Sequence, residues 1–380
     1  RSMEFPKAYT EILNRIDEIN PVEYGHTRNY AKGNITYLSP YISRGVISTR
    51  QVLDVILTKG YKNTEIKKLV QQLAWREYFQ RAWQYLQDDL FDDILHRYNG
   101  VQHKKIPTAI LNAKTGIHSI DNAILELYQT GYMHNHLRLY VASITCNIAK
   151  SDWQLPSHWM YYHLLDGDLA SNNCSWQWVT GNFSSRQYFC NQENINKFTN
   201  TNQTGTFLDK TYEELPQLKI PEELSQLKNI QLTTSLPKKE QPKLDTSLPL
   251  VIYTSYNLDP LWKQDIKANR VLLLEPSHFK QFPVSENVMN FITGLAKKIE
   301  GLQIFSGKLN ELTGVNNFPA IYSKEHPFTK HFPGIKEERD WIFPEVTGYF
   351  NSFFQYWKQC EKILDGKEHT KFPKQMLKAS

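Results

Sequence analysis

Cysteine is scarce in this sequence and long apolar runs are missing, and each absence excludes a class of protein. The four cysteines show no C-x-x-C spacing, which argues against a disulfide framework, a structural zinc site and a cysteine-ligated iron–sulfur cluster. No apolar run approaches the roughly 18 residues of a membrane helix, and no signal peptide is visible. We therefore expect free thiols, no metal, no membrane contact and a cytoplasmic location. The chain opens with Arg-Ser-Met, which leaves its natural start open.

A strong net charge is missing as well. The 380 residues carry a net charge of +5, and the isoelectric point is near 8.7. This charge permits binding to nucleic acid without requiring it, because nucleic-acid-binding domains typically lie above about 9. Aromatic residues make up 13% of the chain, and six of the nine Trp precede residue 180. Such a local excess is typical of an aromatic-lined site, with an aromatic-rich helical core as the alternative.

The spacing of apolar residues predicts a helical domain over residues 1–200. Asn63 opens a segment with apolar residues at helical spacing as far as Phe79, and similar patterns span 119–129 and 132–149. Residues 201–247 are rich in Asn, Thr, Gln, Lys and Pro, which predicts a polar linker.

The pattern changes again over residues 248–366. Four short apolar runs, LVIYTS, RVLLLEPS, LQIFSG and PAIYSK, alternate with or precede helical stretches at 286–299, 307–312 and 348–364. This order predicts a small α/β domain with a parallel, Rossmann-like sheet, followed by a basic tail over 367–380. No G-x-G-x-x-G or P-loop follows these runs, so a nucleotide site there has little support. The expected fold class is therefore multi-domain, all-helical and then α/β.

Two segments have the composition of a cofactor pocket. Asp166–Trp178, DGDLASNNCSWQW, packs two acids, an Asn pair and two Trp into a short stretch that suits an aromatic cofactor. The segment from Gly33 to residue 50 combines hydroxyl side chains with a helix start, for which Ser48 is a plausible N-cap. Such a loop offers N–H and O–H groups to a pyrophosphate, with simple turn capping as the alternative.

Four blocks, in this order, resemble the cryptochrome/photolyase family and cover residues 20–190, half of the chain. They are Tyr24–Arg28 with the following loop to Gln51, QQLAWREYF at 71–79, TGYMHNHLR at 130–138, and the segment Asp166–Trp178. The resemblance implies a helical domain that binds FAD. It places the following residues around that cofactor: Tyr24, Thr36, Leu38, Ser39, Arg76, Asn135, Arg138, Asp166, Asp168 and Asn172.

The resemblance also implies roles for the charged residues. Arg138 would pair with Asp166 at one edge of the flavin ring and tune the charge that the ring carries, with an ion pair that closes the core as the alternative. Asp168 would face the other polar edge. Asn172 would contact the reactive ring nitrogen, where an amide forms hydrogen bonds without imposing charge.

A second set of residues would bind damaged DNA. Gln72 and Trp75 share a helix face, and the family uses these positions, with Trp178, to hold an extruded pyrimidine dimer by stacking. The expected partner is therefore damaged DNA, and the expected location is the nucleoid. The expected DNA contacts are Arg28, His136, Trp75, Trp178 and Arg186, with Arg44, Arg50 and Lys197 as further candidates for phosphate contacts.

Some positions depart from the family pattern. Gln72 stands where most dimer photolyases have Glu, and His136 replaces an Arg with a weaker, pH-dependent cation. The (6-4) photolyases carry a His pair at the positions of Asn135 and Leu139, so the absence of both argues against (6-4) repair. His134 is expected to be a satisfied core histidine.

The expected electron relay is incomplete. Trp176 and Trp153 align with the inner two members of the Trp triad of the family, and no Trp stands near residues 100–103 for the third. Tyr98, Trp83 or Trp159 are the substitutes that the sequence leaves open. The residues expected to carry the reaction are Trp176, Trp153, Asn172, Gln72, Trp75 and Trp178.

These features predict a lyase that splits cyclobutane pyrimidine dimers by electron transfer from photoexcited reduced FAD. One alternative is a cryptochrome-like blue-light photoreceptor without repair, which would bind a protein partner through the α/β domain. Another is a flavin-binding scaffold that has lost its light function. Family members usually begin with an α/β antenna domain, whereas here an α/β segment follows the helical part, either as a rearranged counterpart or as an unrelated addition.

Overall fold

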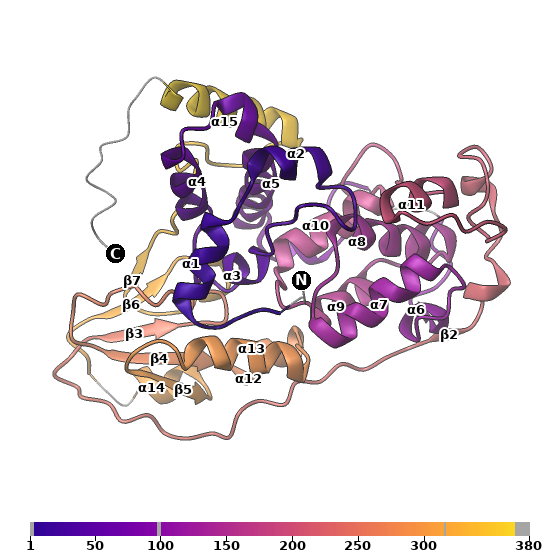
Figure 1. The fold of residues 1–380 in the computed structure, drawn as a ribbon. Helices are drawn as coiled ribbons and strands as arrows, with labels where there is room; N and C mark the ends of the chain where they lie inside the picture. Colours follow the sequence, from indigo (N-terminus) through magenta and orange to yellow (C-terminus); the bar gives the residue numbers. More distant parts are fainter. Residues whose placement is uncertain (1–3, 97–99, 315–316, 369–380) are drawn as a thin grey trace.

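The structure is a computed structural model that describes residues 4–96, 100–314 and 317–368. Figure 1 shows the first helices above the sheet, a second group of helices to one side, and the C-terminal helix at the top. From residue 369 on, the predicted basic tail lies outside the described residues.

Helices make up most of the first 200 residues, as the sequence predicts. Their bounds are α1 (Tyr9–Asp17), α2 (Pro21–Thr27), α3 (Ser39–Ser43), α4 (Thr49–Thr58), α5 (Asn63–Leu86), α6 (Thr108–Leu111), α7 (His118–Thr130), α8 (Asn135–Ala142), α9 (Gln154–His163), α10 (Leu169–Thr180) and α11 (Gln192–Thr199). α8 continues into π-helical turns over Ser143–Ile148, so the expected helix over 132–149 is present in modified form.

The helix starts follow from capping side chains. Ser48 caps α4, because its hydroxyl accepts from the Gln51 N–H while the Gln51 side chain accepts from the Ser48 N–H, which confirms the predicted N-cap. Asp168 caps α10 by accepting from the Ser171 N–H. The cap fixes the direction of Asp168 at the start of the helix that carries Trp176 and Trp178.

The expected parallel sheet is present and has five strands. They are β3 (Leu250–Tyr253), β4 (Asn269–Leu274), β5 (Leu302–Ser306), β6 (Ile321–Lys324) and β7 (Ile335–Glu337), joined in the order β5-β4-β3-β6-β7. All pairs are parallel, and the order is that of a doubly wound α/β sheet. The helices that follow the strands are α12 (Pro276–Gln281), α13 (Glu286–Ala296) and α14 (Leu309–Thr313).

Both faces of the sheet are buried. Leu250 and Ile252 of β3 pack with Leu312 of α14, whereas Val251 and Tyr253 pack on the opposite face, toward α13 and the N-terminal helices. Burial on two faces explains why the strands read as continuous apolar runs instead of alternating ones.

The hydrophobic cores are grouped differently from the linear order of the predicted domains. One cluster joins Ile12 of α1, Ile66 of α5, Val251 of β3, Ile292 of α13 and Tyr356 of α15 (Phe353–Glu368). A second cluster fills the helices between α6 and α11. The α/β part therefore packs on the first helices of the chain, and the division at residues 200 and 247 remains a prediction.

Gly45 lies where the first helices of the chain contact the loop after β3 of the α/β part. Its φ is +67°, and a Cβ there would lie 2.4 Å from the Tyr256 carbonyl oxygen. The Leu258 N–H also donates to the Arg44 carbonyl at 2.8 Å. Only glycine allows this close approach of the loop after β3 to the helical part.

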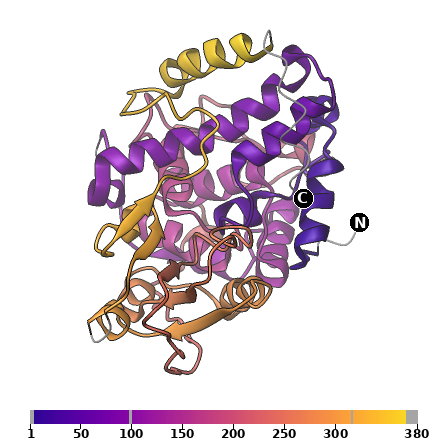
Figure 2. The same cartoon turned by 90° about the vertical axis from the view of Figure 1, so that its left-hand side faces the viewer.

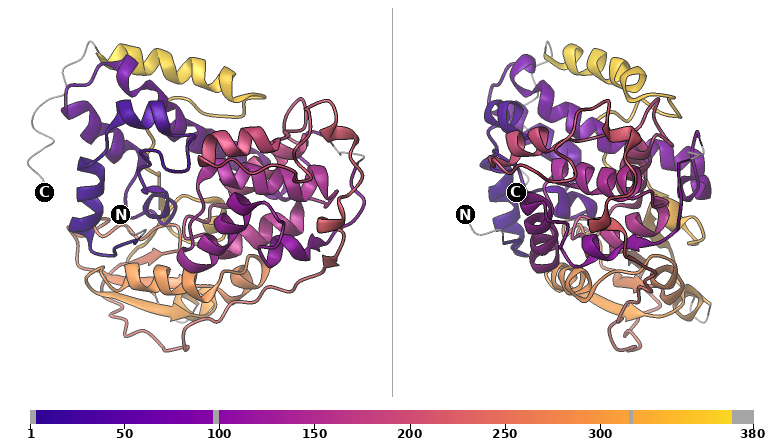
Figure 3. Two further views of the ribbon diagram at one scale, coloured as in Figure 1. Left: turned by 45° about the vertical axis from the view of Figure 1, so that its right-hand side comes forward. Right: turned by 90° about the vertical axis from the view of Figure 1, so that its right-hand side faces the viewer.

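The segment between the two predicted domains is an irregular chain on the surface. It runs from α11, which ends at Thr199, to β3, which begins at Leu250, along the outer side of the molecule (Figures 1 and 3). A short antiparallel pair, β1 (Ile106–Pro107) with β2 (Leu227–Lys228), attaches it to the helices.

The C-terminal helix α15 packs along α5 (Figure 2). The Asn63 side-chain amide donates to the Leu364 carbonyl at 3.0 Å, and Lys67 pairs with Glu361 at 2.7 Å. The buried carboxylate of Glu77 in α5 accepts from the N–H groups of Ile342 and Phe343 at 2.8 and 3.2 Å. The last described helix thus packs on a helix near the start of the described residues.

Candidate functional site

A cleft of about 530 Å³ opens between α2, the loop before α3, α5, α8 and α10. This size lies within the range of small-molecule sites in proteins. It is lined by the following residues of the predicted set: Tyr24, Arg28, Thr36, Ser39, Gln72, Trp75, Arg76, Asn135, His136, Arg138, Asp166, Asp168 and Trp178. The structure therefore brings segments from four distant parts of the sequence to one cavity.

The Arg138–Asp166 pair is present at the wall of the cleft. The two guanidinium nitrogens of Arg138 donate to the two carboxylate oxygens of Asp166 at 3.0 and 2.7 Å. The Ser39 hydroxyl donates to the same carboxylate at 2.6 Å. Burial would lower the pKa of Arg138, but the facing carboxylate raises it overall. Arg138 therefore stays charged, and the fork geometry fixes the orientation of the two side chains.

Asp168 forms a second charged pair, with Arg76. The Arg76 guanidinium lies 3.1 Å from the carboxylate, and the Gln80 amide and the Ser171 hydroxyl donate to the same oxygen at 2.7 and 2.5 Å. Burial acts to raise the pKa of Asp168, but Arg76 and these hydrogen bonds lower it overall. A neutral or anionic heterocycle in the cleft would therefore meet the fixed donors of Arg76 and Arg138, each held by a carboxylate.

Hydrogen bonds continue from Asp168 to the sheet. The Gln80 side chain, which donates to Asp168, accepts from Arg339 at 2.6 Å. Arg339 in turn donates to Glu325, just after β6, at 3.1 Å. The α/β part is thus connected to the wall of the cleft through polar side chains as well as through its core.

A small cavity of about 70 Å³ adjoins the cleft and contains two further predicted residues, Asn172 and Trp176. Asn172 donates to the Ser157 carbonyl at 2.9 Å, which fixes its amide. Trp153 is 2% exposed and donates to Asp93 at 2.8 Å, in the same core cluster as Trp176. Trp159 belongs to that cluster too, Trp83 belongs to the other one, and Tyr98 lies outside the described residues.

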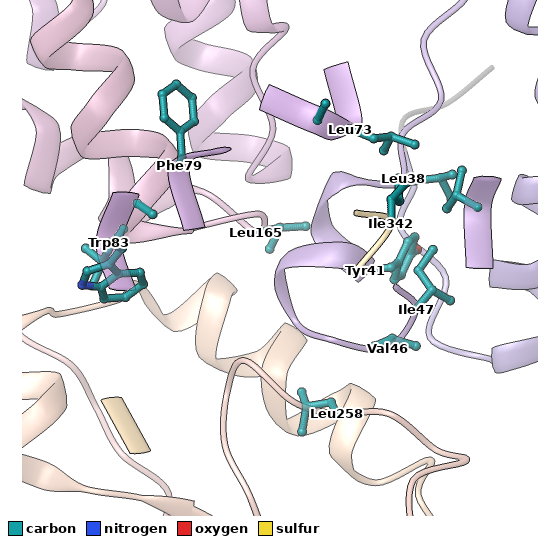
Figure 4. Packing of buried hydrophobic residues seen from close by; sticks show 14 of the residues in the cluster. Leu38, Tyr41, Val46, Ile47, Leu73, Phe79, Trp83, Leu165, Leu258 and Ile342 are labelled. Carbon is teal, nitrogen blue, oxygen red and sulfur yellow. The ribbon is translucent and has the colours of Figure 1, made fainter. Parts of the chain in front are cut away.

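Leu38 is the exception among the predicted cofactor residues. Its side chain is 2% exposed and belongs to the same core cluster as Tyr41 and Ile342, which Figure 4 shows near it. Leu38 stands at the N-cap position of α3, and its side chain belongs to the first core cluster. The structure therefore removes this side chain from the lining of the cleft.

Burial lowers the pKa of both histidines beside the cleft. Burial lowers the pKa of His134 to about 4, and its ring contacts the Arg28 carbonyl at 2.9 Å and the His136 N–H at 3.0 Å, as expected for a satisfied core histidine. Burial also lowers the pKa of His136, which contacts the Asn29 carbonyl at 2.9 Å and packs against Phe198. The lowered pKa argues against a charged His136 near neutral pH, and the contact of this side chain with DNA stays a prediction.

The predicted DNA-contacting arginines fall in three places. Arg28 lines the cleft, and Arg186 is exposed on the surface. Arg44 is 1% exposed and donates to the Leu165 carbonyl at 3.0 Å, so it cannot contact DNA phosphates, contrary to the expectation. Arg50 lies 3.4 Å from the Trp341 carbonyl and so contributes to the contact between the two parts.

Sequence reasoning missed several lining residues. Tyr37, Ser43 and Tyr132 also line the cleft. Tyr132 stands in the segment TGYMHNH, where its aromatic ring next to the polar run was a usable signal. Tyr37 has a φ of +53°, a left-handed conformation that the sequence does not predict for a tyrosine.

The residues present fit a flavin dinucleotide. Tyr24, Trp75 and Tyr132 supply aromatic walls, and the two charged pairs supply fixed hydrogen-bonding groups around them. Among the described residues we find no cluster of three or more His, Cys, Asp or Glu side chains that could hold a metal ion. Across the same residues, every helix is too short or too polar to pass through a bilayer.

Comparison with known proteins agrees with this chemistry. Residues 69–251 match the FAD-binding domain of DNA photolyase. A deoxyribodipyrimidine photo-lyase of Synechococcus is 31% identical over 41% of this chain and 34% of its own length. One of Neurospora crassa is 28% identical over 57% of this chain and 38% of its own. The chain thus spans about a third of the length of these relatives.

A solved cryptochrome structure from Synechocystis is 23% identical and covers 52% of this chain and 44% of its own, with a TM-score of 0.47. The family match begins within α5, so it includes three of the four blocks and leaves out the loop over residues 24–51. Over residues 69–251, just under half of the chain, the protein is similar to the FAD-binding domain of DNA photolyase, and its cofactor is FAD.

Proposed function

We propose that this protein splits cyclobutane pyrimidine dimers in DNA, driven by blue light. The observation that carries the proposal is that Gln72, Trp75 and Trp178 line the same cleft as the Arg138–Asp166 and Arg76–Asp168 pairs. A lesion held by the first group would therefore lie beside a cofactor held by the second.

The division of labour follows from position. Reduced FAD, when bound and excited by light, supplies the electron that opens the cyclobutane ring and takes it back. Arg138, Asp166, Arg76 and Asp168 would orient the ring system, and Asn172 would hold an amide toward it from the adjoining cavity. Trp176 and Trp153, both buried, would pass electrons inward when the cofactor is oxidised.

The aromatic side chains would hold the extruded bases. Trp178 is 37% exposed and Trp75 is partly exposed, so both can offer ring surface to a base that enters from outside. Stacking on an aromatic ring contributes about 1–3 kcal/mol per base and does not depend on base identity. Arg28 at the cleft and exposed Arg186 and Lys197 would contact phosphates, which predicts a salt-dependent affinity.

The test is repair of a thymine dimer in a UV-damaged oligonucleotide. Protein with reduced FAD is compared under blue light and in darkness, beside undamaged DNA. Trp178→Ala should keep FAD and lose most of the repair. Tyr212→Ala is the matched control, because it removes a 49% exposed aromatic ring that does not line the cleft.

Dimer loss that requires light and Trp178 would establish the proposed activity. A yellow, photoreducible protein that leaves the dimer intact would reject it. That result would favour the photoreceptor alternative, with the α/β part as the surface on which to search for a protein partner.

A further inference from the structure

One face of Trp75, the residue assigned to lesion stacking, is already covered. The ring of Phe353, at the start of α15, lies parallel to Trp75 with centroids 3.8 Å apart and an interplanar angle of 10°. Phe353 is 3% exposed, whereas Trp75 is partly exposed and lines the cleft. A base can therefore reach Trp75 only from its other face or its edge.

The covering ring is held firmly in place. Phe353 also packs in parallel with Trp357 and edge-on against Tyr78, at centroid distances of 6.2 and 5.8 Å. Before Phe353 in the sequence, the N–H groups of Ile342 and Phe343 donate to Glu77 of α5. After it, the Leu364 carbonyl of α15 accepts from the Asn63 side chain. A ring fixed by several contacts can pre-organise the residue that it touches.

We propose that Phe353 is a positioning residue for lesion recognition, so that the C-terminal helix forms the back wall of the pocket for pyrimidine bases. Phe353 holds the indole of Trp75 in one plane and leaves one face open to an extruded base. This proposal rests on the function proposed above and extends it to α15, which lies beyond residues 69–251 that match the family.

A purely structural role for Phe353 would give a different result, and three substitutions distinguish that role from the proposed one. Phe353→Leu keeps an apolar side chain and removes the stack on Trp75. Leu364→Ala is the matched control, because Leu364 is 1% exposed in the same helix and core but lies three turns further along. A leucine-to-alanine change in a core leaves a cavity, so this control reports what a loosened α15 does to selectivity. Phe354→Ala, at a 64% exposed position, controls for changes on the surface of α15.

The measurement is the ratio of dissociation constants for undamaged and dimer-containing oligonucleotides, on FAD-loaded protein at one salt concentration. An aromatic pair contributes about 0.5–1.5 kcal/mol beyond its buried area, which converts to about 2- to 12-fold at 1.4 kcal/mol per tenfold. We expect this loss of selectivity for Phe353→Leu, and unchanged selectivity for Leu364→Ala and Phe354→Ala.

Unchanged selectivity in Phe353→Leu, with a selective wild type, would overturn the positioning role and leave the proposed function intact. An equal loss in Leu364→Ala would overturn it as well, because loosening of the helix would then explain the effect. A wild type that does not distinguish damaged from undamaged DNA would reject the proposed function, and with it this extension.

Discussion

Replacing Arg138 by Met should leave a buried carboxylate without its cation. Asp166 has a side-chain exposure of 4%, and Arg138 supplies two of its hydrogen bonds at 3.0 and 2.7 Å. Removing one partner of a buried ion pair costs about 3–5 kcal/mol. Because Ser39 still donates to Asp166 and Arg138 is 20% exposed toward the cleft, we expect the lower end, about 3 kcal/mol.

The double variant Arg138→Met with Asp166→Asn isolates the cause. Asn at position 166 can still accept from Ser39 but carries no charge, so the double variant should recover most of the loss, about 2 kcal/mol. FAD content should fall in both variants, because both lack the charged pair. The double variant should therefore regain stability without regaining FAD.

The assay is urea unfolding of FAD-free protein, followed by circular dichroism and by Trp fluorescence. With a slope near 3 kcal/mol per molar urea, the single variant should lose about 1 M in its midpoint. A double variant as unstable as the single one would refute the reasoning, since the unpaired charge would then not be the cause. A single variant that loses under about 1 kcal/mol would show that Asp166 is not held as a buried ion.

Two further predictions concern the contact between the α/β part and the helices. Gly45→Ala should lower the free energy of unfolding by about 2–4 kcal/mol, because its backbone is left-handed and the new Cβ would clash with the Tyr256 carbonyl. The control Gly60→Ala has a φ of +80° with open space around it, so it should cost only about 1 kcal/mol. Equal costs in urea unfolding would show that the close approach at Gly45 is unimportant. Burial lowers the pKa of His278 to about 4 in the folded protein, from its ordinary value of 6.5. Between these two pH values the unfolded chain binds a proton that the folded protein does not, so the free energy of unfolding falls as the pH drops from 6.5 toward 4. His278→Phe, which suits the surrounding Phe279, Phe282 and Phe328, should lose about 2 kcal/mol less than wild type between pH 7 and pH 5, and parallel losses would refute the assignment.

The local elements were largely predictable from the sequence. The four apolar runs after residue 247 form β3 to β6, because strands buried on both faces have an unmistakable composition. β7 was missed, since Ile335-Lys-Glu is short and its first two side chains are exposed. The helix expected from residue 348 begins at Phe353, five residues later, after an irregular stretch rich in aromatic residues.

The site was predictable only where local motifs carry it. The Arg138–Asp166 pair was expected from the family resemblance and is present. The lowered pKa of His136 follows from its burial in the fold, and the internal role of Arg44 follows from the docking of a loop more than 200 residues away, so neither is visible in a linear pattern. The same holds for Phe353 on Trp75, whose contact joins residues that no motif links.

The return of the chain end to α5 also has a consequence for synthesis on the ribosome. Ile342, whose N–H donates to the Glu77 carboxylate, follows Glu77 by 265 residues. At a synthesis rate of about 5–20 residues per second, roughly 13 to 53 seconds pass between the synthesis of Glu77 and that of its partner. During this interval the aromatic face of α5 has no α15 to cover it. Nascent chains of this protein should therefore depend on chaperones until residues 342–368 have been made, although α5 ends at Leu86.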